Sequence, residues 1–281
     1  MLNKKEIRSL EREFGFRLQK KLGQNFLIDD NIKDKLLNAA DFKIDDIVLE
    51  IGSGLGQLTA DIASSVKKVI AVEYDKKLFS ILRSALKDNR NILLVHEDFL
   101  KFDLKSFLRD DEKLKIFSNL PYYVSTPIIL KLFAHVRYID CAYLTLQKEV
   151  ALRLTAKPGS KEYGSLSLYA EYHCMVERLF DISRNSFYPV PKVDSTTVLM
   201  KMKEGADDRK IDKNDLFELI RAAFSTRRKT LINSLLAREY KKLSRSELSD
   251  ILKKVDIPLN SRAETLCLTD FIKIYESIRK R

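Results

Sequence analysis

The sequence has no tryptophan, only three cysteines and no long apolar segment. Cys141, Cys174 and Cys267 lie far apart, which excludes both a disulfide framework and a Cys-x-x-Cys metal pair. The longest uncharged run, residues 116–130, contains an asparagine and two prolines, so it cannot span a bilayer. The N-terminus is charged from Lys4 onward and lacks the apolar segment of a secretory signal. We expect a soluble cytoplasmic protein with no membrane partner and no metal.

Histidine is also scarce, and the three present stand alone in apolar stretches. No Ser-His-Asp or Cys-His set can be assembled from them, so we interpret them as core or surface residues. Of the 281 residues, 45% are hydrophobic and 32% are charged. This is enough apolar material for a packed core, which excludes general disorder, and the length suits one large domain plus a small one.

The positive charge is concentrated at the two ends of the chain. Residues 1–24 hold 7 basic against 3 acidic side chains, and residues 201–281 hold 20 against 13. The part between them is neutral, with 24 of each sign. A solvated surface is one interpretation of a basic excess, and a membrane-surface helix is another. Segregation of the charge favours a polyanionic partner, because fixed cations displace counterions from phosphates.

Strand-like apolar runs alternate with amphipathic helical stretches through the middle of the chain, which predicts a parallel sheet covered by helices. The expected strands are 47–51, 69–72, 92–96, 115–117, 142–146 and, as an antiparallel edge strand, 195–202. The expected helices are 32–40, with a cap at Asp29 or Asp30, 56–64, 78–86, 127–133, 214–240, 245–255 and 269–281. We predict an α/β domain over residues 1–203 and a small all-helical domain over residues 204–281.

The strand at 47–51 runs directly into Gly52-Ser53-Gly54-Leu55-Gly56 and then a helix. Glycines permit a tight turn and let a ligand approach the backbone. A dinucleotide fingerprint would place its third glycine at position 57, which is Gln57, and the carboxylate of Glu50 opposes a bound pyrophosphate. A cationic ligand suits the loop better than an anionic one. A purely structural turn is the alternative.

Two acidic residues end the next two predicted strands. Glu73 follows Gly54 by 19 residues, where an acid can hold both ribose hydroxyls, and Asp98 can accept from an adenine amine. Parallel strands place such residues at one edge of the sheet, so together they predict a nucleoside pocket. The pattern resembles the S-adenosylmethionine-dependent methyltransferases with a Rossmann-like fold. That resemblance implies that Gly52 and Gly54 approach the methionine moiety of S-adenosylmethionine, and that S-adenosylhomocysteine is the product.

The fourth strand ends in Asn119-Leu120-Pro121-Tyr122. An adenine amine is a poor nucleophile, because its lone pair is delocalised into the ring. Acceptors from the Asn119 side chain and the Leu120 carbonyl favour a pyramidal nitrogen and stabilise its developing charge. Pro121 restricts Leu120 to an extended conformation, and the Tyr122 ring offers a face on which the base can stack. An ordinary turn that closes a strand is the alternative.

This tetrad resembles that of the ribosomal RNA adenine dimethyltransferases, and two flanking segments are similar to the same family. Gly23-Gln24-Asn25-Phe26-Leu27 matches a signature in which Asn25 and Leu27 would cover the cofactor. Phe187-Tyr188-Pro189-Val190-Pro191 begins a second, and there Phe187 would sandwich the target base opposite Tyr122. A plain core aromatic is the other interpretation of Phe187.

The C-terminal region separates two subfamilies, one that modifies two adjacent adenosines near the 3′ end of small-subunit RNA and one that modifies large-subunit RNA and confers macrolide resistance. The segment from Arg221 to Leu235 closely resembles the first. We therefore predict a monomeric enzyme acting on immature small subunits. A non-catalytic RNA-binding assembly or transcription factor competes with this prediction, as does, more remotely, a dehydrogenase. The expected phosphate contacts are Lys20, Lys21, Arg221, Arg227, Arg228 and Lys229.

Overall fold

The computed structural model describes residues 1–16, 18, 23–109, 112–203, 205, 211–226 and 228–280. Its strands are β1 (Phe26–Leu27), β2 (Ile47–Ile51), β3 (Lys68–Glu73), β4 (Ile92–His96), β5 (Leu114–Asn119), β6 (Ile139–Gln147), β7 (Cys174–Ile182), β8 (Phe187–Tyr188) and β9 (Ser195–Met202). Its α-helices are α1 (Lys4–Glu13), α2 (Asp30–Ala40), α3 (Thr59–Ala63), α4 (Lys76–Ala85), α5 (Ser125–Ala134), α6 (Lys148–Thr155), α7 (Ser165–His173), α8 (Lys213–Ala223), α9 (Leu231–Ala237), α10 (Arg245–Lys254) and α11 (Leu268–Arg279).

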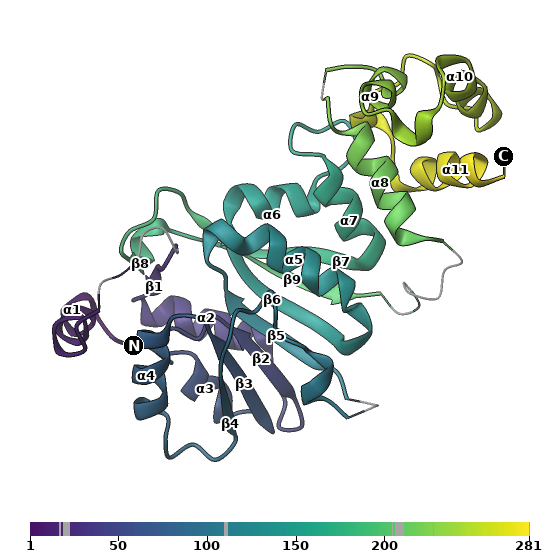
Figure 1. The fold of residues 1–281 in the computed structure, drawn as a ribbon. Helices are drawn as coiled ribbons and strands as arrows, with labels where there is room; N and C mark the ends of the chain where they lie inside the picture. The colour runs from purple at the N-terminus through teal and green to yellow at the C-terminus, as the bar shows by residue number, and fades with distance from the viewer. Residues whose placement is uncertain are drawn as a thin grey trace. The chain divides into compact units, whose positions relative to one another are not determined.

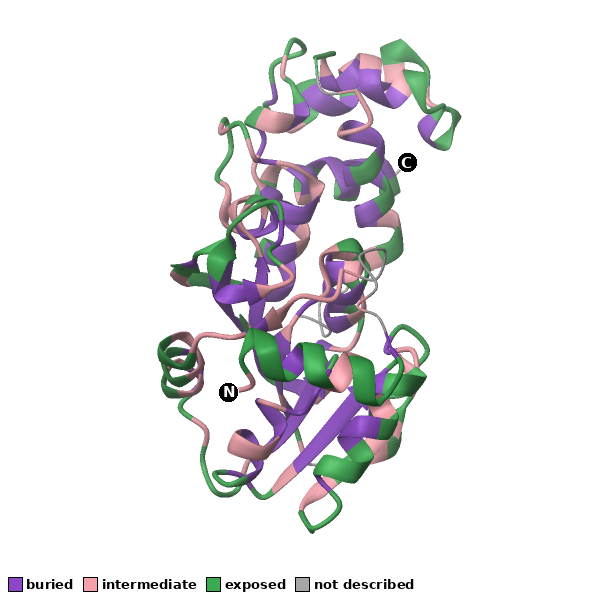
Figure 2. Ribbon diagram, turned by 90° about the vertical axis from the view of Figure 1, so that its left-hand side faces the viewer, coloured by how far each residue is buried: buried purple, intermediate pink, exposed green. Residues whose placement is uncertain are grey.

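The central sheet has seven strands in the order β4-β3-β2-β5-β6-β9-β7 (Figure 1). The pairs from β4 to β6 are parallel, and β9 runs antiparallel to β6. Every residue of β2 is buried, including Glu50, as its otherwise apolar sequence predicts for a strand covered on both faces. In Figure 2 the strands are mostly coloured as buried. The predicted α/β class, mostly parallel with an antiparallel element at one side, is confirmed.

The predicted edge position of residues 195–202 is wrong. β9 lies between β6 and β7, and its first six residues are buried. The edge is β7, which was not expected from the sequence. An edge strand leaves part of its side chains in solvent, and β7 accordingly lacks a regular apolar pattern and carries Glu177, Arg178 and Asp181.

Local sequence explains where several elements begin. Asp29 caps α2 by accepting from the backbone N–H of Ile32 at 3.2 Å, as predicted. The single helical stretch expected over 214–240 is instead two helices, α8 and α9. Thr230 caps the second by accepting from the N–H of Asn233 at 3.4 Å, which starts a new helix after the turn.

The chain divides into two compact units. One comprises Met1–Ala151 and Val176–Glu204, and the other comprises Leu152–Met175 and Gly205–Arg281. The second unit thus includes α7, which the sequence-based division assigned to the first domain. The reason is packing: Leu168 and Tyr172 of α7 belong to the same apolar core as α8.

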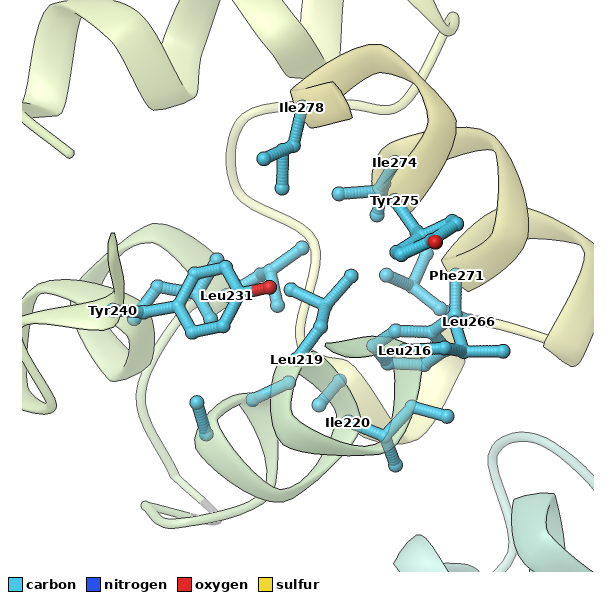
Figure 3. Packing of buried hydrophobic residues seen from close by; sticks show 14 of the residues in the cluster. Leu216, Leu219, Ile220, Leu231, Tyr240, Leu266, Phe271, Ile274, Tyr275 and Ile278 are labelled. Carbon is cyan, nitrogen blue, oxygen red and sulfur yellow. The ribbon is translucent and has the colours of Figure 1, made fainter. Parts of the chain in front are cut away.

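The core of the second unit is formed by apolar side chains of α8, α9 and α11 that converge (Figure 3). Leu216 and Ile220 of α8 pack in the same cluster as Phe271 and Ile274 of α11, and all four are fully buried. Among the described residues, no helix combines the length and apolar character that crossing a bilayer requires.

Candidate active site

A cavity of about 390 Å³ lies in the first unit, at the edge where the parallel strands β2 to β5 reach their carboxyl ends. Ligands of open α/β sheets bind at this edge, and the volume is typical of a small-molecule site. The predicted residues that line it are Asn25, Leu27, Gly52, Gly54, Glu73, Asp98, Asn119, Leu120, Pro121 and Tyr122. Segments nearly a hundred residues apart in the sequence therefore meet at one cavity.

The glycine loop is bound directly to the carboxylate of Glu73. The backbone N–H of Gly54 donates to Oε2 of Glu73 at 2.8 Å, and the N–H of Asp75 donates to Oε1 at 2.7 Å. Burial raises the pKa of Glu73, although these two hydrogen bonds oppose the rise. Gly54 has φ +58°, and a Cβ there would lie 2.8 Å from Cε1 of Phe26. Glycine is thus required at position 54 both by its backbone conformation and by the space available.

Glu50 lies beneath the loop and also borders the cavity. It is 3% exposed, and its Oε2 accepts from the hydroxyl of Thr59 at 2.5 Å. Burial raises the pKa of Glu50 from 4.5 to about 7. A carboxyl in this setting is stabilised in its ionised form by a nearby cation, so the cavity favours a positively charged ligand.

Asp98 is presented by a tight turn after β4. Its Oδ1 accepts from the N–H of Leu100 at 2.9 Å, and its carbonyl accepts from the N–H of Lys101 at 2.8 Å. Phe99 and Leu100 line the cavity beside it. The site thus offers an apolar wall next to a carboxylate acceptor, a combination that suits a purine with an exocyclic amine.

Asn119 ends β5, and a hydrogen bond orients its side chain. Its Nδ2 donates to the backbone carbonyl of Asn25 at 3.2 Å. Asn25 is positioned in turn, because its own Nδ2 donates to the carbonyl of Gly23 at 3.0 Å. With its nitrogen on the Asn25 side, Asn119 offers Oδ1 as an acceptor.

Leu120, Pro121 and Tyr122 form a rigid turn just before the N-terminus of α5. The N–H of Leu120 donates to the carbonyl of Thr145 at 3.1 Å, and the Leu120 side chain is buried. Pro121 has φ −59°, and Tyr122 begins a short 3-10 helix, Tyr122–Val124. The hydroxyls of Tyr122 and Ser195 lie 2.6 Å apart. The backbone and the Tyr122 ring are thus held in place at the cavity.

A comparison of the sequence with protein families gives a match over residues 15–280 to the model described as "Ribosomal RNA adenine dimethylase". The chain belongs to this family. It is therefore an enzyme, an rRNA adenine dimethyltransferase, and its fold is that of the S-adenosylmethionine-dependent methyltransferases.

Individual relatives agree with the family. This dimethylase is 37% identical to "Ribosomal RNA small subunit methyltransferase A" of Alkaliphilus metalliredigens, over 98% of this chain and 97% of the relative. A crystal structure of a dimethyladenosine transferase from Plasmodium falciparum superposes with a TM-score of 0.77 at 30% identity, covering 91% of this chain and 98% of the other. The crystal structure of the 23S rRNA methyltransferase ErmE superposes with a TM-score of 0.65 at 22% identity, covering 90% of this chain and 99% of the other. At this identity the similarity supports the fold alone.

Phe187 does not lie at the cavity of this dimethylase. It is 1% exposed and packs in an apolar cluster with Leu27 and Leu36. The cause is strand register: β8 pairs antiparallel with β1, and Phe187 lies opposite Leu27. The burial of Phe187 thus matches its interpretation as a core aromatic.

Sequence reasoning missed the structural roles of two residues that border the cavity, Asp75 and Gln57. Asp75 caps α4 and accepts from Nε2 of Gln24 at 3.2 Å, which connects the segment before β1 to the end of β3. Gln57, which argued against a dinucleotide site, accepts from the N–H of Leu2 at 2.7 Å. The position of Asp75, two residues after Glu73 and before a helical pattern, was a capping signal that could have identified it.

The predicted phosphate contacts are placed only in part. Lys20, Lys21 and Arg227 lie outside the described residues. Arg228 and Lys229 are exposed on the second unit. Arg221, also exposed, donates from its guanidinium to the hydroxyl of Tyr169 on α7. The exposed cations of the second unit are available to a polyanion, as nucleic-acid binding requires.

Proposed function

We propose that this dimethylase transfers methyl groups from S-adenosylmethionine to the exocyclic amines of two adjacent adenosines, in a loop near the 3′ end of small-subunit rRNA. The observation that carries the proposal is the juxtaposition of Asn119, Leu120 and Tyr122 with Glu73 and Asp98 around one cavity. A site for an amine acceptor thus adjoins a site for a nucleoside. Immature small subunits are the proposed substrate, and S-adenosylhomocysteine is the product.

The residues present fit S-adenosylmethionine. The buried carboxyls of Glu50 and Glu73 suit a ligand with positive charge, and Gly52 and Gly54 line the cavity with backbone that carries no side chain. In the proposed arrangement Glu73 holds the ribose, Asp98 accepts from the adenine amine, and Asn25 and Leu27 cover the ligand. When bound, S-adenosylmethionine supplies a methyl group made electrophilic by its sulfonium.

The chain's own contribution is to prepare the target amine. Oδ1 of Asn119 and the carbonyl of Leu120 accept its two hydrogens, which favours a pyramidal nitrogen with its lone pair directed at the methyl carbon. The Tyr122 ring stacks on the base, and stacking is worth about 1–3 kcal/mol. The methylated amine is acidic enough to lose its proton to water, so no general base is needed. Rate then comes mainly from positioning and from the two acceptors.

Binding of the RNA is assigned to the basic ends of the chain, with Arg221, Arg228 and Lys229 as phosphate contacts on the second unit. A target base must leave its stack to reach the cavity, and this costs less in a loop than in a helix. The small subunit is favoured as the source of the RNA because curated relatives at 36–38% identity are named for it.

The test is methyl transfer from labelled S-adenosylmethionine to two substrates, immature small subunits and naked large-subunit RNA. We expect labelled N6,N6-dimethyladenosine at two adjacent positions of the small-subunit RNA and none in the large-subunit RNA. Label in the large-subunit RNA alone would establish the large-subunit alternative, and RNA binding without transfer would establish a non-catalytic assembly factor. Mapping dimethyladenosine in ribosomes from cells with and without the gene extends the same test to the cell.

A further inference from the structure

Helix α5 begins three residues after Tyr122 and carries a lysine that contacts the loop after β4. The ammonium of Lys131 donates to the backbone carbonyl of Phe99 at 2.7 Å and to that of Phe102 at 2.5 Å. It also lies 5.1 Å from the centroid of the Phe99 ring. One side chain thus joins the helix that follows the acceptor tetrad to the loop that presents Asp98.

That loop is closed on its other side by Asp98 itself. The carbonyl of Asp98 accepts from the N–H groups of Lys101 at 2.8 Å and Phe102 at 3.1 Å, while its carboxylate accepts from the N–H of Leu100. The N–H of Phe102 also donates to the carbonyl of Phe99 at 3.2 Å, and the carbonyls of Phe99 and Phe102 both accept from Lys131. Without a cation between them, converging carbonyl dipoles repel one another, and the turn would open.

The ammonium of Lys131 is partly buried and lies near three carboxylates. Its side chain is half-buried, and burial lowers the pKa of Lys131, while the nearby carboxylates of Glu97, Asp98 and Asp103 favour its charged form. A partly desolvated ammonium forms stronger hydrogen bonds to carbonyls than one in water. The anchoring should therefore be sensitive to loss of the charge and not only to loss of the side chain's bulk.

We propose that Lys131 is a positioning residue for the cofactor: it fixes the turn over residues 98–102 so that the Asp98 carboxylate meets the exocyclic amine of the cofactor's adenine. Because Lys131 projects from α5, it also fixes the position of the adenine site relative to the acceptor tetrad, residues 119–122. The inference rests on the proposed function, through the role assigned there to Asp98.

The experiment measures binding of two ligands by calorimetry, without RNA or turnover. One is S-adenosylhomocysteine, and the other is S-inosylhomocysteine, in which a carbonyl replaces the adenine amine. The intact protein should prefer the first by about tenfold or more, as expected for a hydrogen bond to a carboxylate. In Lys131→Met this preference should fall to less than threefold. Lys131→Arg should restore most of it, and Lys101→Met, which alters an exposed lysine of the same turn, should leave it unchanged.

The preference between the two ligands shows whether Lys131 positions Asp98 or only stabilises the fold. A purely structural role would weaken both ligands equally, and a preference retained in Lys131→Met overturns the proposal. If that variant does not fold, Lys131→Gln, which keeps a polar side chain but no charge, provides the same comparison. If the intact protein itself shows no preference, the role assigned to Asp98 fails, and this inference fails with it.

Discussion

The side-chain nitrogen of Asn119 lies 3.2 Å from the backbone carbonyl oxygen of Asn25, although 94 residues separate them. The segment proposed to cover the cofactor therefore orients the side chain proposed to bind the acceptor. In the proposed mechanism Asn119 therefore connects the acceptor site to the cofactor site, and substitutions can test each site separately.

Asn119→Ala should reduce methyl transfer at least about 100-fold, because it removes one of the two acceptors for the target amine. The dissociation constant of S-adenosylhomocysteine should change less than about threefold, since the glycine loop, Glu73 and Asp98 remain. Labelled transfer to immature small subunits and calorimetry measure the two effects. Asn89→Ala, at an exposed asparagine, is the control. Normal dimethylation by Asn119→Ala would remove it from the mechanism.

Ser195→Ala should raise the KM for the RNA substrate without changing the affinity for the cofactor. It removes the partner that holds the Tyr122 hydroxyl at 2.6 Å, and a neutral hydrogen bond is worth about 1 kcal/mol, or roughly a fivefold rise in KM for RNA. Tyr122→Phe breaks the same bond, so the double variant should be no worse than the poorer single one. Additive losses would mean that the two residues act independently.

Gly54→Ala should lower affinity for S-adenosylhomocysteine at least about tenfold. The new Cβ would lie 2.8 Å from the Phe26 ring, so either the loop or the cover segment must move. Gly15→Ala is a matched control, because Gly15 has the same φ of +58° but nothing within 4 Å of a Cβ. Both variants should lose similar stability through backbone strain, and calorimetry should show a binding defect only at position 54.

Glu50→Gln should stabilise the protein at pH 8 more than at pH 5. The folded state raises the pKa of Glu50 from 4.5 to about 7, so the contribution of Glu50 to stability falls as pH rises from about 4.5 to 7. Glutamine keeps an acceptor for Thr59 without the charge. The difference in unfolding free energy between variant and wild type should therefore grow by up to about 3 kcal/mol between the two pH values. Denaturant titrations at each pH would contradict this if the difference were constant.

Replacing Arg228 and Lys229 together by glutamine should weaken RNA binding and flatten its salt dependence. Each lost phosphate contact lowers the slope of log K against log salt by about 0.7–0.9. The matched control replaces Lys253 and Lys254, an exposed pair at the end of α10 in the same unit. Equal effects of both pairs would indicate a general response to charge and would place no RNA contact at positions 228 and 229.

The sequence was most informative about residues at the ends of the buried parallel strands, because the same residues shape the backbone there and face the cavity. Gly54, Glu73 and Asn119 each end or follow a buried parallel strand, and that geometry is enough to bring them together. The position of Phe187 was not predictable in this way. Its motif marks a rigid segment, but the register of β8 against β1 decides which way the ring points, and two-residue strands leave no periodic signal.

Similar reasons account for the other errors. The antiparallel run at 195–202 was recognised as a strand, but its neighbour on the outer side, β7, is partly solvated and gives a weak pattern. The break between α8 and α9 depends on a single capping threonine within an otherwise helical apolar spacing. The apolar periodicity of a sequence predicts the type of an element. The pairing of distant strands decides its place in the sheet, and local capping decides where a helix ends.

The small sheet formed by β1 and β8 has a consequence for biosynthesis. Leu27 pairs with Phe187, 160 residues later, and this pairing holds the strand that directly follows Asn25. A nascent chain shorter than about 190 residues can already complete strands β2 to β5 and the glycine loop, yet it lacks the partner strand that secures the cover. The proposed cover of the cofactor is thus completed only after most of the first unit has been synthesised.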